Sequence, residues 1–237
     1  MILRQFLIGI LIRYSELKMD KFISKKQKEI WGEALSLPNC SNLRDSGIRE
    51  LSEYFCKKPD EIINVLNQAK RLLSEEWINR NINSKDESSV ISFYNNTQLE
   101  IFELMNWHIE NLEASPINYI TSLDIAKRNG AKMYLDYGSG IGSGAILFFK
   151  NGFNVACADI STPLLDFIRW RHRKRNLNAE YIDLKKDELP DNSYDIVTCF
   201  DVLEHLVNPH ETLNKLRKAL KDNGLLILSS FFKTQTE

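Results

Sequence analysis

Apolar positions in the first half of the chain, from about residue 21 to residue 129, recur at helical spacing. Pro59 and Asp60 form a typical helix start, and the apolar residues after them recur at intervals of three and four, as on one face of an amphipathic helix. These residues are Ile62, Val65, Leu66, Ala69, Leu72 and Leu73. The first half is therefore predicted to be mostly α-helical.

A polar stretch interrupts this helical pattern at residues 81–89, NINSKDESS. Such a cluster of turn-forming residues predicts a loop between an early helical group and a later one that begins near Tyr94. In the later group a second apolar stripe comprises Leu99, Phe102, Met105 and Ile109. We interpret this stripe as core packing.

After Gly130 the pattern changes to short apolar runs that alternate with helical segments, which is typical of β-α units and a mainly parallel sheet. Strands are expected near residues 132–137, 154–158, 180–183, 196–200 and 225–229. Helices are expected near residues 143–151, 163–175 and 209–221, the first ended by Gly152 and the last by Gly224. We therefore divide the chain into a helical region at residues 1–130 and an α/β core at residues 131–237. In such a core the carboxyl ends of the strands share one edge of the sheet, and ligands bind there.

Composition and charge narrow the function classes. The 237 residues carry 31 Lys plus Arg against 32 Asp plus Glu, and neither half has the basic excess of a nucleic-acid-binding domain. The four cysteines show no CxxC pair, so they suggest neither a zinc site nor a disulfide framework, and a cytoplasmic location fits best. The apolar run at residues 6–12 is too short to span a membrane. Met19 is an alternative start, which would make residues 1–18 an upstream extension.

The strongest chemical signal is a glycine-rich turn directly after the first expected strand. It reads DYGSGIGSG from Asp136 to Gly144, and Asp159 follows at the end of the next strand. Glycines let the backbone turn sharply and let a ligand approach closely, while a carboxylate at the second strand end can accept both hydroxyl hydrogens of an adenosine ribose. Spacing alone does not exclude NAD. However, Asp136 would repel the pyrophosphate of NAD and would favour a cofactor that carries positive charge.

The second half resembles the class I S-adenosylmethionine-dependent methyltransferases, in particular the small-molecule enzymes with a D-x-G-x-G-x-G loop. The resemblance covers about residues 132–231. Beside the glycine loop and Asp159 it rests on Asp183 after the third strand, on LPDNSYDIV at residues 189–197, and on DVLEHL at residues 201–206. It implies a Rossmann-like doubly wound sheet, S-adenosyl-L-methionine as cofactor, and methyl transfer to an oxygen, nitrogen or carbon atom of a small molecule.

The resemblance also assigns residues to the methionine end of the cofactor. Gly138, Gly140 and Gly142 would wrap the methionine moiety, with Asp136 close to its amino group. Phe200 would lie beside the methyl donor. The alternative for the glycines is tight packing alone.

For the adenosine end, the resemblance implies that Asp159 holds the ribose and that Ile160 flanks the adenine. Asp183 would accept a hydrogen bond from the adenine amino group, and the backbone of Leu184 would reach the ring. The alternative for Asp183 is that it caps a turn. Asp195 is expected to be structural, at the start of the fourth strand.

The segment from Asp201 to His205 allows two chemical interpretations. Two carboxylates and an imidazole within five positions suit a metal ion or proton transfer, but the same string resembles the one in metal-free family members. We therefore expect no metal and take His205 as the first candidate for a general base.

Other side chains are weaker candidates. Aromatic residues of the helical region would line the acceptor pocket, namely Phe93, Tyr94, Trp107 and His108. The basic run at residues 169–175 is interpreted as a solvated helix face rather than a phosphate or nucleic-acid site.

Two alternatives to a methyltransferase stay open on the sequence: a non-catalytic scaffold that retains the fold, and a nicotinamide-dependent oxidoreductase. The chain ends soon after the fifth expected strand, where the resembled family continues through a helix and a two-stranded hairpin. We therefore expect an incomplete core, or a sheet edge that the helical region or a partner covers. Self-association as a homo-oligomer is left open.

Overall fold

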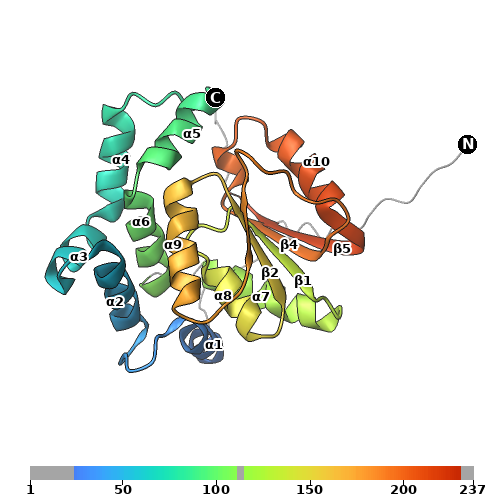
Figure 1. Ribbon diagram of the computed structural model, residues 1–237, viewed down its shortest axis with the longest axis horizontal. Coiled ribbons are helices and arrows are strands. Elements are labelled where there is room, and N and C mark those ends of the chain that lie inside the picture. The colour runs from blue at the N-terminus through green and yellow to red at the C-terminus, as the bar shows by residue number, and fades with distance from the viewer. Residues whose placement is uncertain (1–23, 111–114, 231–237) are drawn as a thin grey trace, which may run out of the picture.

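The computed structural model describes residues 24–110 and 115–230. Within these ranges seven helices precede the first strand, and helices and strands alternate for most of the chain after it (Figure 1). The first seven helices are α1 (Lys25–Leu35), α2 (Leu43–Phe55), α3 (Pro59–Leu66), α4 (Ala69–Asn79), α5 (Glu87–Asn96), α6 (Leu99–Ile109) and α7 (Ser115–Arg128). There follow β1 (Met133–Tyr137), α8 (Ser143–Lys150), β2 (Asn154–Asp159), α9 (Thr162–Arg173), β3 (Glu180–Asp183), β4 (Tyr194–Phe200), the 3₁₀ turn η1 (Leu203–His205), α10 (Pro209–Ala219) and β5 (Leu220–Ser229).

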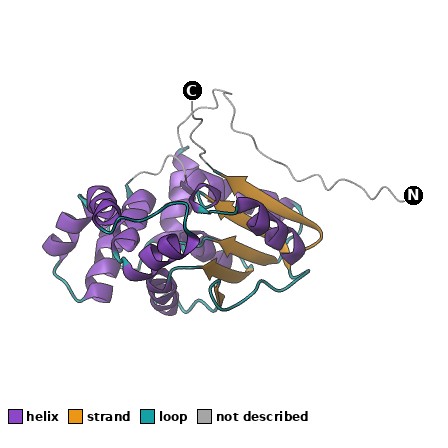
Figure 2. Ribbon diagram, turned by 90° about the horizontal axis from the view of Figure 1, so that it is seen from above, coloured by secondary structure: helices purple, strands orange, loops and turns teal. Residues whose placement is uncertain are grey.

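The five described strands form one parallel sheet in the order β3-β2-β1-β4-β5. The chain therefore moves outward from β1 to β3 and then returns to place β4 on the other side of β1. In a doubly wound sheet the crevice for a ligand opens at this switch point, outside the carboxyl ends of the strands. Figure 2 shows the sheet on one side of the molecule and a group of helices beside it. The predicted α/β class and its parallel sheet are confirmed.

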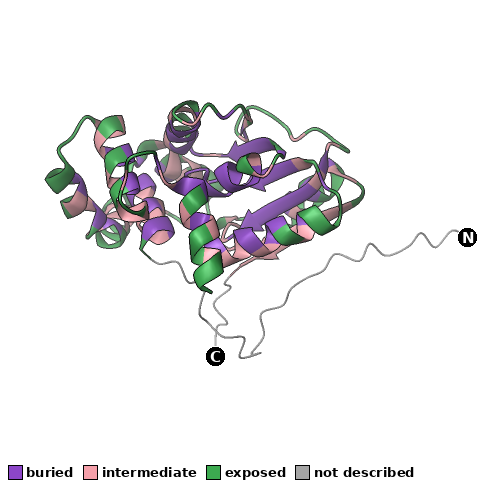
Figure 3. Cartoon of the chain, turned by 90° about the horizontal axis from the view of Figure 1, so that it is seen from below, coloured by how far each residue is buried: buried purple, intermediate pink, exposed green. Residues whose placement is uncertain are grey.

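Helices lie on both faces of the sheet. Strands β1, β2 and β4 are mostly buried, whereas β5 is half-buried along most of its length and the outer helices keep exposed faces (Figure 3). On one face a core joins α8 and α9 to residues of α1 and α7, including Trp31, Leu35 and Tyr119. On the other face α10 packs through Leu216 and Ala219. Because one core contains side chains from both sides of residue 130, α1 and α7 are part of the layer that covers the sheet.

Helices α2, α3, α4 and α6 supply a second core. Buried residues of α6, including Met105, pack with Leu51 and Ile62, and this core reaches the α/β part at Ile141 and Phe167. The apolar stripe predicted on this helix is confirmed as core at Phe102, Met105 and Ile109.

Two element boundaries differ from the predictions. Helix α5 begins at Glu87, capped by the Asp86 side chain, which lies inside the predicted loop. Helix α10 ends at Ala219, and Gly224 lies within β5 instead of ending the helix. Leu220 pairs with Tyr194 and Leu225 with Ile196, so β5 holds extra residues in a register shift around Gly224.

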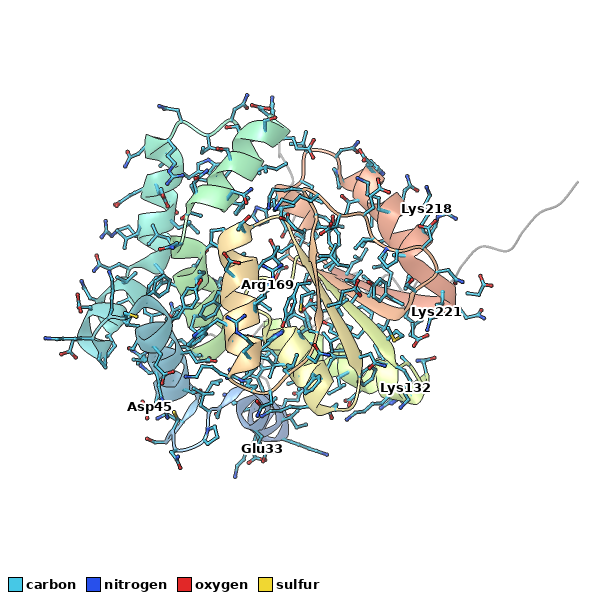
Figure 4. The ribbon with its side chains drawn as sticks, in the orientation of Figure 1. Glu33, Asp45, Lys132, Arg169, Lys218 and Lys221 are labelled. Atoms are coloured by element: carbon cyan, nitrogen blue, oxygen red, sulfur yellow. The ribbon has the colours of Figure 1, made fainter. Side chains whose placement is uncertain are left out.

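Asp195 joins the starts of three strands, as expected for a structural residue. Its Oδ2 accepts hydrogen bonds from the backbone N–H groups of Lys132 and Met133, both at 2.8 Å, and its Oδ1 accepts one from Lys221 Nζ at 2.9 Å. Figure 4 shows Lys132 and Lys221 near one another at this end of the sheet. These hydrogen bonds of Asp195 lie at the amino ends of the strands, opposite the edge of the sheet where a ligand is expected to bind.

No helix within the described ranges is long and apolar enough to cross a membrane. The hypotheses on the apolar run at residues 6–12 and on Met19 as a start concern residues outside those ranges, as does the tail after residue 230.

Candidate cofactor and acceptor site

The glycine loop leaves β1 in backbone conformations that glycine adopts most easily. Gly138, Gly140 and Gly142 have φ angles of 69°, 54° and 72°, all in the left-handed region. Space is restricted as well, because a Cβ on Gly138 would lie 2.2 Å from Val202 Cγ2 and one on Gly140 would lie 3.0 Å from Leu104 Cδ1. Glycine is therefore required here both for the turn and for the close approach of neighbouring segments.

Asp159 ties the glycine loop to the end of β2. Its Oδ2 accepts a hydrogen bond from Gly140 N at 3.0 Å, and its Oδ1 accepts one from Ser161 N at 2.9 Å. Burial raises the pKa of Asp159 to about 6, although these backbone N–H groups favour the charged form. A carboxylate offers about four acceptor positions, so after these two bonds the side chain can still accept two hydroxyl hydrogens.

Asp136 lies beneath the loop and is 1% exposed. Its Oδ1 accepts hydrogen bonds from the Tyr119 hydroxyl at 3.2 Å and from Thr198 Oγ1 at 3.0 Å. Its Oδ2 is buried and has no hydrogen-bond partner among the described residues. Burial raises the pKa of Asp136 to about 7, against the effect of these hydroxyl donors.

A cavity opens at the carboxyl ends of β1 and β4 and collects most of the predicted site residues. Those that line it are Gly138, Gly140, Asp159, Ile160, Leu184, Phe200 and His205. Asp136, Gly142 and Asp183 do not line it. Asp136 is connected to it through Tyr119, which lines the cavity and donates to the Asp136 carboxylate.

Asp183 instead closes the turn after β3. Its Oδ1 accepts a hydrogen bond from Lys185 N at 3.2 Å and an ion-pair contact from Lys185 Nζ at 2.7 Å, and Lys186 Nζ lies 3.3 Å from its Oδ2. Hydrogen bonds from the two lysines outweigh burial and hold the pKa of Asp183 below its usual value. The structure therefore shows the turn-capping arrangement that the sequence left as an alternative.

One face of α6 lies beside the glycine loop and forms part of the cavity wall. Glu100, Leu104 and His108 are four residues apart and all line the cavity, as do Val90, Ile91 and Tyr94 of α5. Of the aromatic residues predicted to line a pocket, Tyr94 and His108 do so, whereas Phe93 is 2% exposed and packs against Trp77 in the helical core, and Trp107 does not line the cavity. Glu100 and Leu104 were not predicted as site residues from the sequence. Their i, i+4 spacing beside the core-facing stripe was the available signal.

His108 is held by a buried polar network. Its Nδ1 lies 2.8 Å from Ser143 Oγ, which also accepts a hydrogen bond from Arg171 at 2.7 Å. Arg171 pairs in turn with Glu50 of α2, and Arg175 also pairs with Glu50. Burial and the charge of Arg171 lower the pKa of His108 to about 3, so its ring is neutral near pH 7.

This network corrects the interpretation of the basic run as a solvated face. Arg171 is 1% exposed and also donates to the Ile141 carbonyl at 2.9 Å, inside the glycine loop. Arg169 does point outward from α9 (Figure 4), and Arg173 and Lys174 are exposed. Two of the run's arginines, Arg171 and Arg175, therefore anchor the helical group to the core.

The segment after β4 forms the rim of the cavity. Asp201 has a φ of 54° and accepts a hydrogen bond from Ser229 Oγ, and Glu204 accepts one from Ser230 Oγ. His205 is exposed at the cavity mouth. Within the described ranges, no group of three or more His, Cys, Asp or Glu side chains is placed to hold a metal ion.

Comparison with known proteins places this architecture in a family. A family model described as a methyltransferase domain matches residues 110–236, which is more than half of the chain. The chain belongs to the methyltransferase domain family.

Individual relatives are similar to this methyltransferase-domain protein over only part of its length. A ubiquinone biosynthesis O-methyltransferase of Actinobacillus pleuropneumoniae is 29% identical over 153 residues, covering 58% of this chain and 65% of the relative. An uncharacterized protein of Methanocaldococcus jannaschii is 36% identical over 107 residues, covering 45% of each chain. A solved protein of Pyrococcus horikoshii aligns at 24% identity with a TM-score of 0.43, covering 51% of this chain and 60% of the other. The chain spans less than two thirds of the length of these curated relatives.

The residues present fit S-adenosylmethionine in three respects. The glycine loop leaves no room for side chains between the loop and its neighbours, Asp159 retains two acceptor positions beside the loop, and Asp136 holds a buried carboxylate oxygen without a partner. The α6 wall lies outside the matched region, because that region begins at residue 110. The family match therefore covers the α/β core but not the α6 wall of the cavity.

Proposed function

We propose that this protein is an S-adenosylmethionine-dependent methyltransferase that acts on an oxygen, nitrogen or carbon atom of a small-molecule acceptor. The observation that carries the proposal is the meeting of the glycine loop, Asp159 and Phe200 at one cavity, at the switch point of the sheet in a methyltransferase-domain protein. The named relatives that are O-methyltransferases are consistent with this class.

The roles follow the chemistry of each group. Gly138, Gly140 and Gly142 would wrap the methionine moiety, since a loop without side chains allows the closest approach. Asp159 would accept both ribose hydroxyl hydrogens through its remaining lone pairs. Ile160 and Leu184 line the cavity and would enclose the adenine. Asp183 caps the turn after β3, and the Leu184 N–H donates to the Asp159 carbonyl at 3.0 Å, so neither is assigned a hydrogen bond to the ring.

Electrostatics favour a positively charged cofactor over NAD. Asp136 places a carboxylate under the loop, one of its oxygens lacks a partner, and the methionine amino group of the cofactor would be drawn toward it. The pyrophosphate of NAD would meet the same carboxylate as a like charge. We infer that Asp136 acts mainly through this field, because Tyr119 and not Asp136 lines the cavity.

When bound, the cofactor supplies a methyl group on a sulfonium, so the protein mainly has to hold donor and acceptor at reacting distance, which contributes roughly 7–11 kcal/mol in well-oriented systems. Phe200 would pack beside the methyl group. For a hydroxyl or ammonium acceptor, His205 at the cavity mouth is the candidate general base. The walls from α5 and α6 would exclude water and select the acceptor.

The proposal includes a cytoplasmic location, for which the cysteine pattern is the support, and leaves a homo-oligomer open. Titration calorimetry with S-adenosylmethionine and S-adenosylhomocysteine tests the cofactor assignment. Methyl transfer from labelled cofactor to a panel of small acceptors tests turnover. Cofactor binding without transfer to any acceptor would favour a non-catalytic scaffold.

A further inference from the structure

The cavity is acidic. Glu87, Glu100, Asp159 and Asp201 line it, and no lysine or arginine of the described residues does. The deep histidine, His108, contributes no positive charge near pH 7, because burial and Arg171 lower its pKa to about 3. A cavity lined by carboxylates and by no lysine or arginine favours cations over phosphate or carboxylate ligands.

Glu100 is the carboxylate whose partner is missing. It lies in the first turn of α6, and its Oε2 is buried without a hydrogen-bond partner in the part of the chain that the structure describes. Burial, together with the charges of Asp159 and Glu103, raises its pKa well above the usual value. Glu100 also lines the cavity, so an ammonium group bound there would favour the charged form of this carboxyl and lower its pKa again.

We propose that the methyl acceptor is an amine and that Glu100 binds its amino group from the α6 wall. Before methyl transfer the bound ammonium would give one proton to His205, the candidate base at the cavity mouth, so that the nitrogen lone pair is free to accept the methyl group. The inference rests on the proposed methyltransferase function and adds the acceptor class to it. We assign Glu100 to the acceptor rather than the cofactor because α6 carries it, whereas the groups assigned to the cofactor lie on strands β1, β2 and β4 and on the segments that follow these strands.

Aromatic side chains support the same class of ligand. Tyr94, Tyr119 and Phe200 line the cavity, with the rings of Tyr119 and Phe200 in edge contact at 5.0 Å between centroids. Aromatic faces attract ammonium groups by about 0.5–2 kcal/mol. A carboxylate and aromatic rings in one cavity therefore recognise an amine better than an alcohol or an acid of the same size.

Calorimetry on the full chain saturated with S-adenosylhomocysteine tests this with three probes that share one ring: benzylamine, benzyl alcohol and benzoate. We expect benzylamine to bind about tenfold more tightly than either of the others. Glu100→Gln should weaken benzylamine binding by about tenfold and change the affinity for benzyl alcohol and for S-adenosylhomocysteine by less than about threefold. Glu103→Gln, the same change on the same helix outside the cavity lining, serves as the control.

Several results would overturn the proposal: equal or tighter binding of benzyl alcohol or benzoate, no benzylamine binding, or unchanged benzylamine binding by the Glu100→Gln variant. If that variant loses S-adenosylhomocysteine affinity instead, Glu100 is a cofactor residue. The comparison of probes on the unaltered protein decides the acceptor class even if the variant does not fold. Failure of S-adenosylhomocysteine itself to bind would refute the proposed function, whereas its binding without a preference for the amine would refute the acceptor class alone.

Discussion

Replacing Asp159 with Asn tests the ribose assignment while nearly preserving side-chain shape. In the structure both carboxylate oxygens accept backbone hydrogen bonds, at 3.0 Å from Gly140 and 2.9 Å from Ser161. An amide has one acceptor oxygen, so its NH₂ group would face a backbone N–H and one bond would be lost. It would also offer a donor where the second ribose hydroxyl needs an acceptor.

The size of the effect follows from these lost bonds. A hydrogen bond to a charged group contributes about 1.5–3 kcal/mol, so loss of one ribose bond alone lowers the affinity for S-adenosylhomocysteine by about 10- to 100-fold. Titration calorimetry measures this change in affinity directly. Thermal unfolding of the same variant shows separately how far loss of the backbone hydrogen bond destabilises the glycine loop. Asp166→Asn, on the exposed side of α9, is the matched control and should leave affinity unchanged.

The same carboxylate predicts the pH dependence of binding. Burial raises the pKa of Asp159 to about 6 in the ligand-free protein, and ribose hydroxyls donate to the charged form. Affinity should therefore be constant above about pH 7 and fall as the pH drops through 6, and this dependence should disappear in the Asp159→Asn variant. Equal affinities of the two proteins, or a wild-type affinity that does not change between about pH 5 and 8, would refute the assignment.

Three further predictions concern the loop and its supports. Gly138→Ala should lower both stability and S-adenosylhomocysteine affinity, since its Cβ would lie 2.2 Å from Val202 Cγ2 at a φ of 69°, where a left-handed residue costs about 1–2 kcal/mol; a variant with unchanged melting temperature and affinity would contradict this. Glu50→Gln should lower the free energy of unfolding by about 3–5 kcal/mol in urea titrations, because it leaves the buried Arg171 without its partner, and a loss below about 1 kcal/mol would count against the anchor. Asp136→Asn should remove a pH dependence of the free energy of unfolding. The pKa of Asp136 in the folded protein is about 7, above the usual 3.8, so the wild-type protein loses up to about 4 kcal/mol of stability as the pH rises from about 4 to 7. Parallel unfolding curves of the two proteins across that range would show that the Asp136 carboxyl is not perturbed.

The strands of the sheet could be predicted because the residues that mark each strand lie within or next to that strand in the sequence. Strands buried on both faces read as short continuous apolar runs, and each ended near a turn signal, as at Gly138 after β1. The exception is β5, where Gly224 resembles a helix stop in the sequence but lies in a register shift beside Tyr194. That outcome depends on pairing with β4, which no local pattern records.

The helical wall of the site was only partly predictable. A cavity-facing stripe and a core-facing stripe have the same helical period, so the pattern of α6 revealed the core residues but not the role of Glu100. Arg171 was misinterpreted for a different reason. Its partner Glu50 lies 121 positions away in the sequence, and only the folded chain shows that the charge is buried and paired.

The central claim is that the cavity at the switch point binds a sulfonium cofactor. Titration calorimetry tests this claim directly when S-adenosylmethionine, S-adenosylhomocysteine and NAD are titrated in turn into the 237-residue chain. We expect saturable binding of the first two at one site per chain and no binding of NAD. Binding of NAD, or of none of the three, would contradict it.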